Sequence, residues 1–344
     1  MKAAILGAAG YAGVELTRLL LGHPCFELVT VTSDRDAGKR VADVYPALAT
    51  CDLVYQSHDA PSLGPEVEVV FLAVPHTAAM AVAPGLLAEG RTVIDASADF
   101  RLRDAGLYAA WYGTPHAAPA LLDEAVYGLP ELWRDSLPGA RLVACPGCYP
   151  TASLLAVAPA IEAGVTVSDR VVIDAKSGVS GAGRSPSAAA HFCAANEAVA
   201  AYKAGAHRHT PEIAQGLADL GMAHPRLTFV PHLVPMTRGL LATAYLEVEP
   251  GFAVDEAHEL YAARFAAEPF VTVHSPSRMP STGEVSGTNR AHIGVAVDEL
   301  SATLIVSVAI DNLVKGTSGQ AVQCANLALG LTETAGLDLP CPVV

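Results

Sequence analysis

The 344-residue chain has few charged and few aromatic residues, and its basic residues are scarce. Only 16% of the residues are charged and 6% are aromatic, whereas 51% are hydrophobic. This composition excludes an intrinsically disordered protein, which combines low hydrophobicity with high net charge. With 21 Lys and Arg against 35 Asp and Glu, the net charge is −14, and no basic run is present. We therefore expect no nucleic-acid partner.

The chain also lacks a long uninterrupted apolar segment. No window of about 18 residues, the length a membrane helix needs, is free of charge, glycine or proline. The N-terminal segment has no convincing signal-peptide cleavage site. Seven cysteines are an odd number, which argues against a disulfide framework and for a reducing compartment. We expect a cytoplasmic protein without membrane attachment.

Strand and helix signals alternate over the first 150 residues and then give way to strands. Alternation predicts a mostly parallel sheet with helical crossovers. We predict strands at 2–6, 27–32, 67–73, 91–96 and 141–144 and helices at 14–21 and 77–89. Further along we predict helices at 151–163, 213–221, 254–267 and 319–331 and strands at 170–176, 226–234, 240–248, 270–273 and 302–310.

These patterns predict an α/β protein of about two domains. The first is a Rossmann-type parallel-sheet nucleotide domain. The second is an α+β domain with a mixed or antiparallel sheet covered on one face. We expect the boundary near Gly147–Pro150.

A glycine-rich segment joins the first predicted strand to the first predicted helix. Its sequence is Gly7-Ala8-Ala9-Gly10-Tyr11-Ala12-Gly13, a relative of the dinucleotide-binding G-x-G-x-x-G motif. Glycines permit a tight turn and a close approach of pyrophosphate, which the helix N-terminus attracts. A plain tight turn is the alternative, and the position near the start of the chain favours nucleotide binding.

The end of the second predicted strand favours NADP over NAD. Ser33 and Arg35 follow this strand and have donors for a 2′-phosphate. Asp34 is the counter-argument, because an acidic residue here binds the ribose hydroxyl of NAD. A solvated loop is the alternative role for Arg35 and for Lys39 nearby.

Cys148 lies at or just before a predicted helix, after a Pro-Gly turn. A helix N-terminus lowers the pKa of a thiol and favours the reactive thiolate. Cys145 and Cys148 also form C-x-x-C, which leaves a redox pair or half of a zinc site as alternatives. We interpret Cys148 as a nucleophile.

The densest group of polar side chains is His207-Arg208-His209-Thr210-Pro211-Glu212. His207 and His209 precede a helix, and Glu212 is close enough in sequence to orient one ring. Acid–base chemistry is the favoured role. A structural role and metal binding are alternatives, but no third ligand is spaced to match, and we expect no metal.

A loop of small residues follows the strand at 170–176. It runs from Ser177 to Arg184 and offers backbone N–H groups with Ser180 and Arg184 as further donors. This arrangement favours an anion nest for a substrate phosphate, and a flexible glycine loop is the alternative.

Ten motifs, in order along nearly the whole chain, resemble the N-acetyl-γ-glutamyl-phosphate reductases, a family of the aspartate-semialdehyde-dehydrogenase-like group. The set as a whole is specific, although each motif alone is weak. The matching segments are 7–13, 32–33, 75–76, 95–101, 127–131, 146–151, 176–184, 207–212, 231–239 and 311–320.

The resemblance implies an NADP-dependent reductase of arginine biosynthesis that forms a thioester on Cys148, with His209 or His207 moving protons. It implies that the last helix rejoins the nucleotide domain, which gives domains of 1–147 with 313–344 and of 148–312. It also implies homo-oligomers, dimers or tetramers, built through the second domain. The expected cofactor contacts are Gly7, Ala9, Gly10, Tyr11, Ala12, Gly13, Ser33, Arg35, Pro75, Ser177, Gly178 and Asn312, and the expected substrate contacts are Ser180, Gly181 and Arg184. Arg238 is a candidate for the substrate carboxylate, because a guanidinium pairs with it in two parallel hydrogen bonds, and a surface salt bridge is the alternative.

One residue departs from the family pattern. Cys145 stands where such proteins usually have Asn, which puts in doubt any hydrogen bond from that side chain. Two alternative functions remain: a carrier-protein-linked α-aminoadipyl-phosphate reductase of lysine biosynthesis, and a non-catalytic nucleotide sensor. The absence of a basic docking surface favours the free substrate over an acidic carrier protein.

Overall fold

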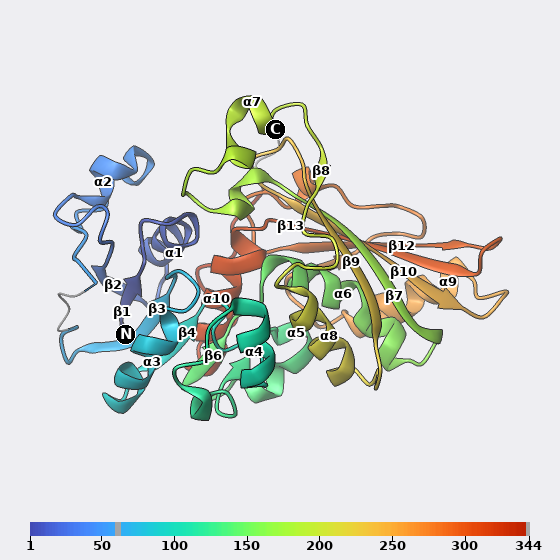
Figure 1. Cartoon of the computed structure of the whole chain (residues 1–344), viewed down its shortest axis with the longest axis horizontal. Coiled ribbons are helices and arrows are strands. Elements are labelled where there is room, and N and C mark those ends of the chain that lie inside the picture. Colours follow the sequence, from blue (N-terminus) through green and yellow to red (C-terminus); the bar gives the residue numbers. More distant parts are fainter. Residues whose placement is uncertain (59–62, 342–344) are drawn as a thin grey trace. The chain divides into compact units, whose positions relative to one another are not determined.

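A computed structural model describes residues 1–58 and 63–341 (Figure 1). The chain divides into two compact units. Unit 1 comprises residues 1–146 and 317–339, and unit 2 comprises residues 147–316 with the C-terminal residues from Pro340. None of the helices in the described part combines the length and apolar character that a membrane span requires.

Unit 1 contains a parallel six-stranded sheet, as the strand–helix alternation predicted. Its strands are short apolar runs in the sequence, because the strands of a parallel sheet are buried on both faces. In spatial order they are β2 (Glu27–Val31), β1 (Lys2–Leu6), β3 (Val67–Leu72), β4 (Thr92–Asp95), β6 (Leu142–Ala144) and β5 (Val126–Tyr127). The strand order reverses beside β1, so the carboxyl ends of β1 and β3 form the edge where α/β sheets bind ligands.

The helices of unit 1 come from both parts of the chain. They are α1 (Tyr11–Leu21), α2 (Val41–Val44), α3 (Ala79–Ala88), α4 (Ala105–Tyr112), α5 (Pro130–Trp133) and α10 (Gly319–Ala328). Three short 3₁₀ segments are η1 (Pro46–Leu48), η2 (Pro119–Leu121) and η3 (Arg134–Ser136). The last helix, α10, contacts α1 and β4.

Unit 2 contains a mixed seven-stranded sheet. In spatial order its strands are β11 (Val271–Val273), β12 (Ala291–Asp298), β13 (Thr303–Ile310), β10 (Leu240–Val248), β7 (Thr166–Ser177), β9 (Arg226–Leu233) and β8 (Ala200–Ala201). The pairs β7–β9 and β11–β12 are parallel and the others are antiparallel. The mixed sheet confirms the fold class predicted for this part of the chain.

Helices cover one face of this sheet. Helix α6 (Cys148–Glu162) packs on β10 and β13 and contacts both α8 (Thr210–Asp219) and α9 (Val254–Arg264), which themselves contact the sheet. Shorter segments are α7 (Phe192–Ala195), η4 (Val179–Ala182), η5 (Ala188–Ala190), η6 (Thr282–Glu284) and the π-helix η7 (Val314–Ser318). Helix α6 is almost wholly buried, which makes it the central core element of unit 2.

Two differences from the predicted elements bear on function. Helix α6 begins at Cys148 rather than at Thr151, because Pro150 falls in the first turn, where a missing N–H costs no hydrogen bond. Strand β12 was missed. Its Gly294 interrupts the apolar pattern, and a Cβ there would lie 2.4 Å from the carbonyl oxygen of Arg278.

Candidate active site

The glycine-rich segment of unit 1 forms a tight cradle between β1 and α1. Gly7 has a φ of +87°, and a Cβ on it would lie 2.4 Å from the carbonyl oxygen of Ala73, beyond the end of β3. A Cβ on Gly13 would lie 2.3 Å from the carbonyl oxygen of Gly7. Both positions therefore require glycine. The N-terminus of α1 lies at the edge of the sheet where the strand order reverses, and its geometry fits a dinucleotide pyrophosphate.

The residues after β2 fit NADP better than NAD. Asp34, the residue that would bind a ribose hydroxyl, accepts hydrogen bonds from the Ser57 hydroxyl at 2.9 Å and the His58 backbone N–H at 2.7 Å. These two donors lower the pKa of Asp34 below its ordinary value. Arg35 is exposed, so the cation beside this carboxylate is accessible to a 2′-phosphate.

A second set of residues in unit 1 organises the loops around the cradle, and sequence reasoning gave it no role. Asp99 is fully buried and accepts from the backbone N–H groups of Thr77 at 2.7 Å and Met80 at 3.0 Å. Thr77 has a φ of +76°, a strained conformation for a β-branched residue. Arg101 Nε donates to the carbonyl oxygen of Cys145 at 2.7 Å. The segment 95–101 thus fixes both the loop after β3 and the turn that leads to Cys148.

Cys148 is the first residue of α6 and is partly exposed. The preceding Gly147 has extended backbone angles and no side-chain cap, so the thiol lies at an uncapped helix N-terminus. There the positive end of the helix dipole favours a thiolate. A Cβ at Gly316 would lie 2.6 Å from Cys148 Cβ. The glycine after Lys315 is therefore needed for the chain to pass beside the thiol.

Glu212 holds the turn that precedes Cys148. Its side chain is 2% exposed, and Oε1 accepts a hydrogen bond from the Gly147 backbone N–H at 2.9 Å. This backbone contact, one residue before the thiol, gives Glu212 a role in positioning Cys148. That Glu212 orients a histidine ring stays a prediction.

An aromatic cluster brings the two histidines next to Tyr149, the neighbour of Cys148. The ring centroids of His207 and His209 are 4.9 Å apart, and they lie 5.5 and 5.9 Å from that of Tyr149. Tyr149 donates to the carbonyl oxygen of His232 at 3.2 Å and accepts from the Tyr202 hydroxyl at 3.1 Å. The cluster therefore joins α6, the loop before α8 and strand β9.

Burial shifts the pKa values of His207 and Tyr202 in this cluster in opposite directions. Burial, together with the positive charges of Lys203 and Arg208, lowers the pKa of His207 to about 4. His207 is therefore a neutral ring at neutral pH, and its Nδ1 accepts a hydrogen bond from the backbone N–H of His209 at 3.2 Å. Burial also raises the pKa of Tyr202 to about 12, so its hydroxyl stays protonated.

The loop from Ser177 to Arg184 does not offer the free backbone N–H groups that its sequence suggested. The N–H groups of Gly178, Val179 and Ser180 donate to the carbonyl oxygens of Gly239, Met236 and Thr237 at 2.9, 2.9 and 3.1 Å. Those of Gly181 and Gly183 donate within the loop. The prediction of a backbone anion nest was wrong because a segment about 60 residues away takes these donors.

The Asn312 side chain links the same loop to the backbone next to Arg238. Asn312 accepts from the Gly239 N–H at 2.8 Å and donates to Ser180 Oγ at 2.9 Å. Arg238 pairs with the buried carboxylate of Asp311 at 3.2 Å, and its own side chain is 30% exposed. Unit 2 therefore assembles Ser180, Asn312 and Arg238 around one polar segment.

The predicted site residues fall into two groups. Unit 2 holds Cys148, His207, His209, Glu212, Ser177, Gly178, Ser180, Gly181, Arg184, Arg238 and Asn312. Unit 1 holds Gly7, Ala9, Gly10, Tyr11, Ala12, Gly13, Ser33, Arg35 and Pro75. Ser33 is buried, with its hydroxyl accepting from the Asp36 N–H at 3.3 Å, whereas Pro75 is exposed.

Two domain families match the chain. Residues 2–140 match the semialdehyde dehydrogenase NAD-binding domain, and residues 148–312 match the semialdehyde dehydrogenase dimerisation domain. The chain is similar to the N-acetyl-gamma-glutamyl-phosphate reductases of Dehalococcoides mccartyi, at 50% identity over 98% of this chain and 97% of that one, and of Desulforudis audaxviator, at 49% identity over 99% of both chains.

Solved structures share the fold at low sequence identity. Aspartate semialdehyde dehydrogenase II from Vibrio cholerae has a TM-score of 0.72 at 16% identity, covering 95% of this chain and 97% of that one. Aspartate semialdehyde dehydrogenase with NADP from Candida albicans has a TM-score of 0.70 at 16% identity, with the same coverage. These structures therefore share their fold with about 95% of this chain.

Proposed function

Because this chain belongs to the N-acetyl-γ-glutamyl-phosphate reductase family, we propose that it reduces N-acetyl-γ-glutamyl phosphate to N-acetylglutamate 5-semialdehyde and phosphate, in arginine biosynthesis. The family relation extends over nearly the entire chain. Cys148 carries the proposal, because it provides a partly exposed thiol at an uncapped helix N-terminus.

The reaction begins with the Cys148 thiolate. Its sulfur attacks the γ-acyl carbon, the bond from that carbon to the phosphate oxygen breaks, and phosphate leaves. The product is a thioester on Cys148. A thiolate suits both halves of the reaction, since it is a strong nucleophile and later a good leaving group. NADPH, when bound, supplies the hydride that reduces the acyl carbon.

Proton transfer is assigned to His209. Reduction of the thioester gives a hemithioacetal on Cys148, and its collapse releases the aldehyde and the thiolate. One histidine donates a proton to the developing oxyanion and takes it back at collapse. His207 has a pKa of about 4, so at neutral pH almost none of it is in the protonated form that could donate. We therefore place His209 in this role and give His207 the role of supporting its position.

Unit 1 is assigned as the NADP(H)-binding domain. The support is the glycine cradle, at which any side chain on Gly7 or Gly13 would collide with backbone, and the placement of Asp34 and Arg35. We propose that unit 1 binds the cofactor and that unit 2 carries catalysis and oligomerisation. The predicted division was 1–147 with 313–344 and 148–312, whereas residues 313–316 lie in unit 2. Pro75 is a further proposed cofactor contact in unit 1, and Ser177, Gly178 and Asn312 are the cofactor contacts proposed for unit 2.

The substrate is held by polar side chains of unit 2. We assign Ser180 and Arg184 to the phosphate and Arg238 to the carboxylate, since a guanidinium pairs with a carboxylate in two parallel hydrogen bonds. Gly181, which the sequence also suggested, is left out because its N–H donates to the carbonyl oxygen of Gly178. Asp311 holds Arg238 from the buried side. With the backbone donors of this loop already occupied, Arg184 is the main source of positive charge for the phosphate.

A homo-oligomer, dimer or tetramer, is proposed from the match to a dimerisation domain. The sheet face of β10 opposite the helices carries the exposed Tyr245, which is a candidate contact. Light scattering of the purified protein at several concentrations tests this assembly.

A cytoplasmic location follows from the proposed pathway and the cofactor.

The experiment that tests the function compares substrates. We expect purified protein to oxidise NADPH with free N-acetyl-γ-glutamyl phosphate far faster than with the carrier-linked α-aminoadipyl analogue. In reverse it should reduce NADP⁺ with the semialdehyde only when phosphate is present. A preference for the carrier-linked substrate would assign the chain to lysine biosynthesis, and absence of both reactions would indicate a nucleotide sensor.

A further inference from the structure

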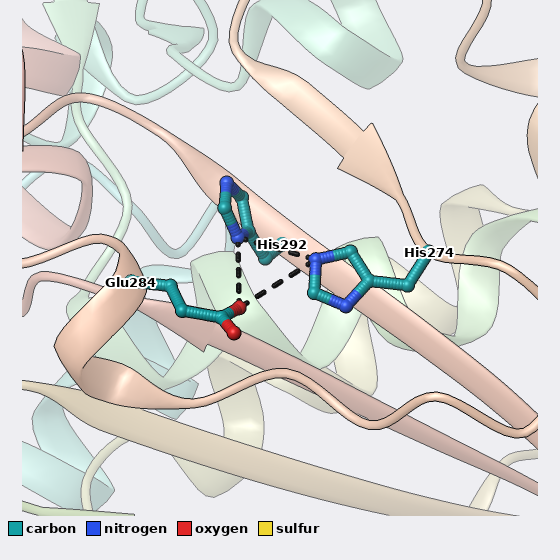
Figure 2. Close-up of side chains that lie close together, drawn as sticks. All are labelled: His274, Glu284 and His292. Atoms are coloured by element: carbon teal, nitrogen blue, oxygen red, sulfur yellow. Dashed lines mark hydrogen bonds and ion pairs between the residues drawn. The ribbon is translucent and has the colours of Figure 1, made fainter.

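Two histidines and a glutamate converge beside the β11–β12 pair of unit 2. Figure 2 shows His274, Glu284 and His292 pointing toward one another. His274 directly follows β11, Glu284 ends η6, and His292 is the second residue of β12. The parallel register pairs Thr272 with His292, which brings the two rings together. None of the three takes part in the proposed reaction.

The three facing atoms form a compact triangle. His274 Nε2 lies 3.3 Å from His292 Nδ1, and Glu284 Oε2 lies 3.2 Å from His292 Nδ1 and 3.6 Å from His274 Nε2. A tetrahedral metal ion with bonds of about 2.0–2.1 Å holds its ligand atoms about 3.3–3.4 Å apart. The spacing of this triangle is therefore that of three corners of a tetrahedral site.

Hydrogen bonding alone does not satisfy this arrangement. The carboxylate oxygen is only an acceptor, and a neutral imidazole has one proton for its two nitrogens. If His274 Nε2 and His292 Nδ1 both carry a proton and donate it to Glu284, the two N–H groups face each other at the His–His contact. If only one of the two nitrogens carries a proton, the other nitrogen faces the Glu284 oxygen lone pair against lone pair. A single cation accepts lone pairs from all three atoms.

The surroundings also suit a metal. His274 is only 5% exposed, so its ring lies out of bulk water. Arg278 lies 3.0 Å from the other carboxylate oxygen, Oε1, and holds it away from the triangle. This outer contact orients the ligand in the way that partners of metal ligands commonly do.

We propose that His274 Nε2, Glu284 Oε2 and His292 Nδ1 bind a divalent transition-metal ion of the Zn²⁺ class, with water as the fourth ligand. Two imidazoles and a carboxylate match the ligand preference of Zn²⁺. His274 and His292 flank the segment of residues 275–291, so a metal bound to both joins the two ends of that segment. Within that segment, the Gly287 N–H donates to the Asp311 carboxylate at 2.7 Å, and Asp311 also pairs with Arg238. The metal thus stabilises the segment that packs on this ion pair.

Metal binding is measured by calorimetric titration of chelator-treated full-length protein with Zn²⁺. The titration uses the Cys148→Ser protein, because the reactive thiolate would itself bind Zn²⁺. We expect one ion per chain at this site, and its loss in His274→Gln, His292→Gln and the nearly isosteric Glu284→Gln. Arg278→Gln should keep the site but weaken affinity about tenfold or more. His224→Ala, which removes an exposed histidine of unit 2, should have no effect.

Two further measurements separate lost ligands from lost structure. Co²⁺ added to the same proteins should give the strong visible absorption of a tetrahedral site, and Zn²⁺ should raise the melting temperature only where the triad is intact. A Glu284→Gln protein that folds, as judged by circular dichroism, but binds no ion at this site supports the proposal. The proposal is overturned when the parent protein binds no more Zn²⁺ than the Glu284→Gln protein.

Discussion

Glu212 Oε1 accepts a hydrogen bond from the Gly147 backbone N–H at 2.9 Å, immediately before the first residue of α6. The two residues are 65 positions apart, and α8 packs on α6. The contact fixes the turn from which Cys148 emerges. A buried carboxylate thus contributes to the placement of the thiol through the backbone of the preceding residue.

This contact predicts different effects for two substitutions of Glu212. Glu212→Ala leaves the Gly147 N–H without its acceptor, which costs about 1–3 kcal/mol and lets the thiol shift. We expect kcat to fall about 100-fold, together with the rate of iodoacetamide alkylation of Cys148. Glu212→Gln keeps an oxygen acceptor and should stay within about tenfold of the parent. Glu299→Ala, an exposed control, should be unchanged. Full activity and alkylation in Glu212→Ala would contradict the positioning role.

A second prediction concerns Gly316. A methyl group there would lie 2.6 Å from Cys148 Cβ, so Gly316→Ala must displace the cysteine or its own backbone. We expect at least a tenfold loss of kcat with little change in the Kd for NADPH. Gly85→Ala is the matched control, because it lies in helix α3 with open space around its Cβ; alanine there should be neutral or slightly stabilising. Equal kcat in both variants would show that the crowding is relieved without moving Cys148.

The third prediction is a pH dependence of stability. His207 has a pKa of about 4 in the folded chain, compared with its ordinary 6.5. Between these values the unfolded chain binds more protons, so the free energy of unfolding falls as pH decreases from about 6.5 to about 4. We expect urea unfolding of His207→Gln to show a shallower decline over this window. The exposed-site variant His224→Gln should keep the parent slope, and an unchanged slope in His207→Gln would refute the assignment to His207.

Cofactor discrimination gives a fourth prediction. Arg35→Ala should raise the Kd for NADPH about tenfold, in line with the loss of one charge-assisted hydrogen bond, and should leave the Kd for NADH nearly unchanged. Arg40→Ala is the control from the same loop, because Arg40 pairs with Asp52 at 2.7 Å. Fluorescence titrations with both cofactors measure the effect. An equal loss for NADPH and NADH would remove Arg35 from 2′-phosphate recognition.

Local patterns were sufficient to predict much of the fold. The Gly7–Gly13 segment could be recognised as a dinucleotide-binding motif from adjacent residues, because a strand, a turn and the start of a helix follow one another directly. Strand β3 is a short apolar run, as expected for a strand that is buried on both faces. Along β10, buried residues alternate with more exposed ones, as expected for a strand with only one covered face. Cys148 could be singled out for the same reason, since a Pro-Gly turn precedes its helix.

Contacts between distant segments could not be predicted in this way. The backbone donors of Gly178 and Ser180 are taken by the segment at 236–239, a pairing that no local spacing encodes. The histidine–glutamate triad depends on the β11–β12 register, and β12 itself was missed because of Gly294. Glu212 was selected from the sequence, but its contact with Gly147 depends on the packing of α8 on α6, which no local spacing encodes.

The thioester on Cys148 is the central claim, and mass spectrometry tests it most directly. Protein mixed with N-acetyl-γ-glutamyl phosphate without NADPH, and then quenched in acid, should gain one N-acetylglutamyl group on the peptide that contains Cys148. The Cys145→Ser protein should gain the same group, and the Cys148→Ser protein should gain none and show no turnover while still binding NADPH. Turnover in Cys148→Ser, or an active parent protein that never forms the adduct, would contradict the account.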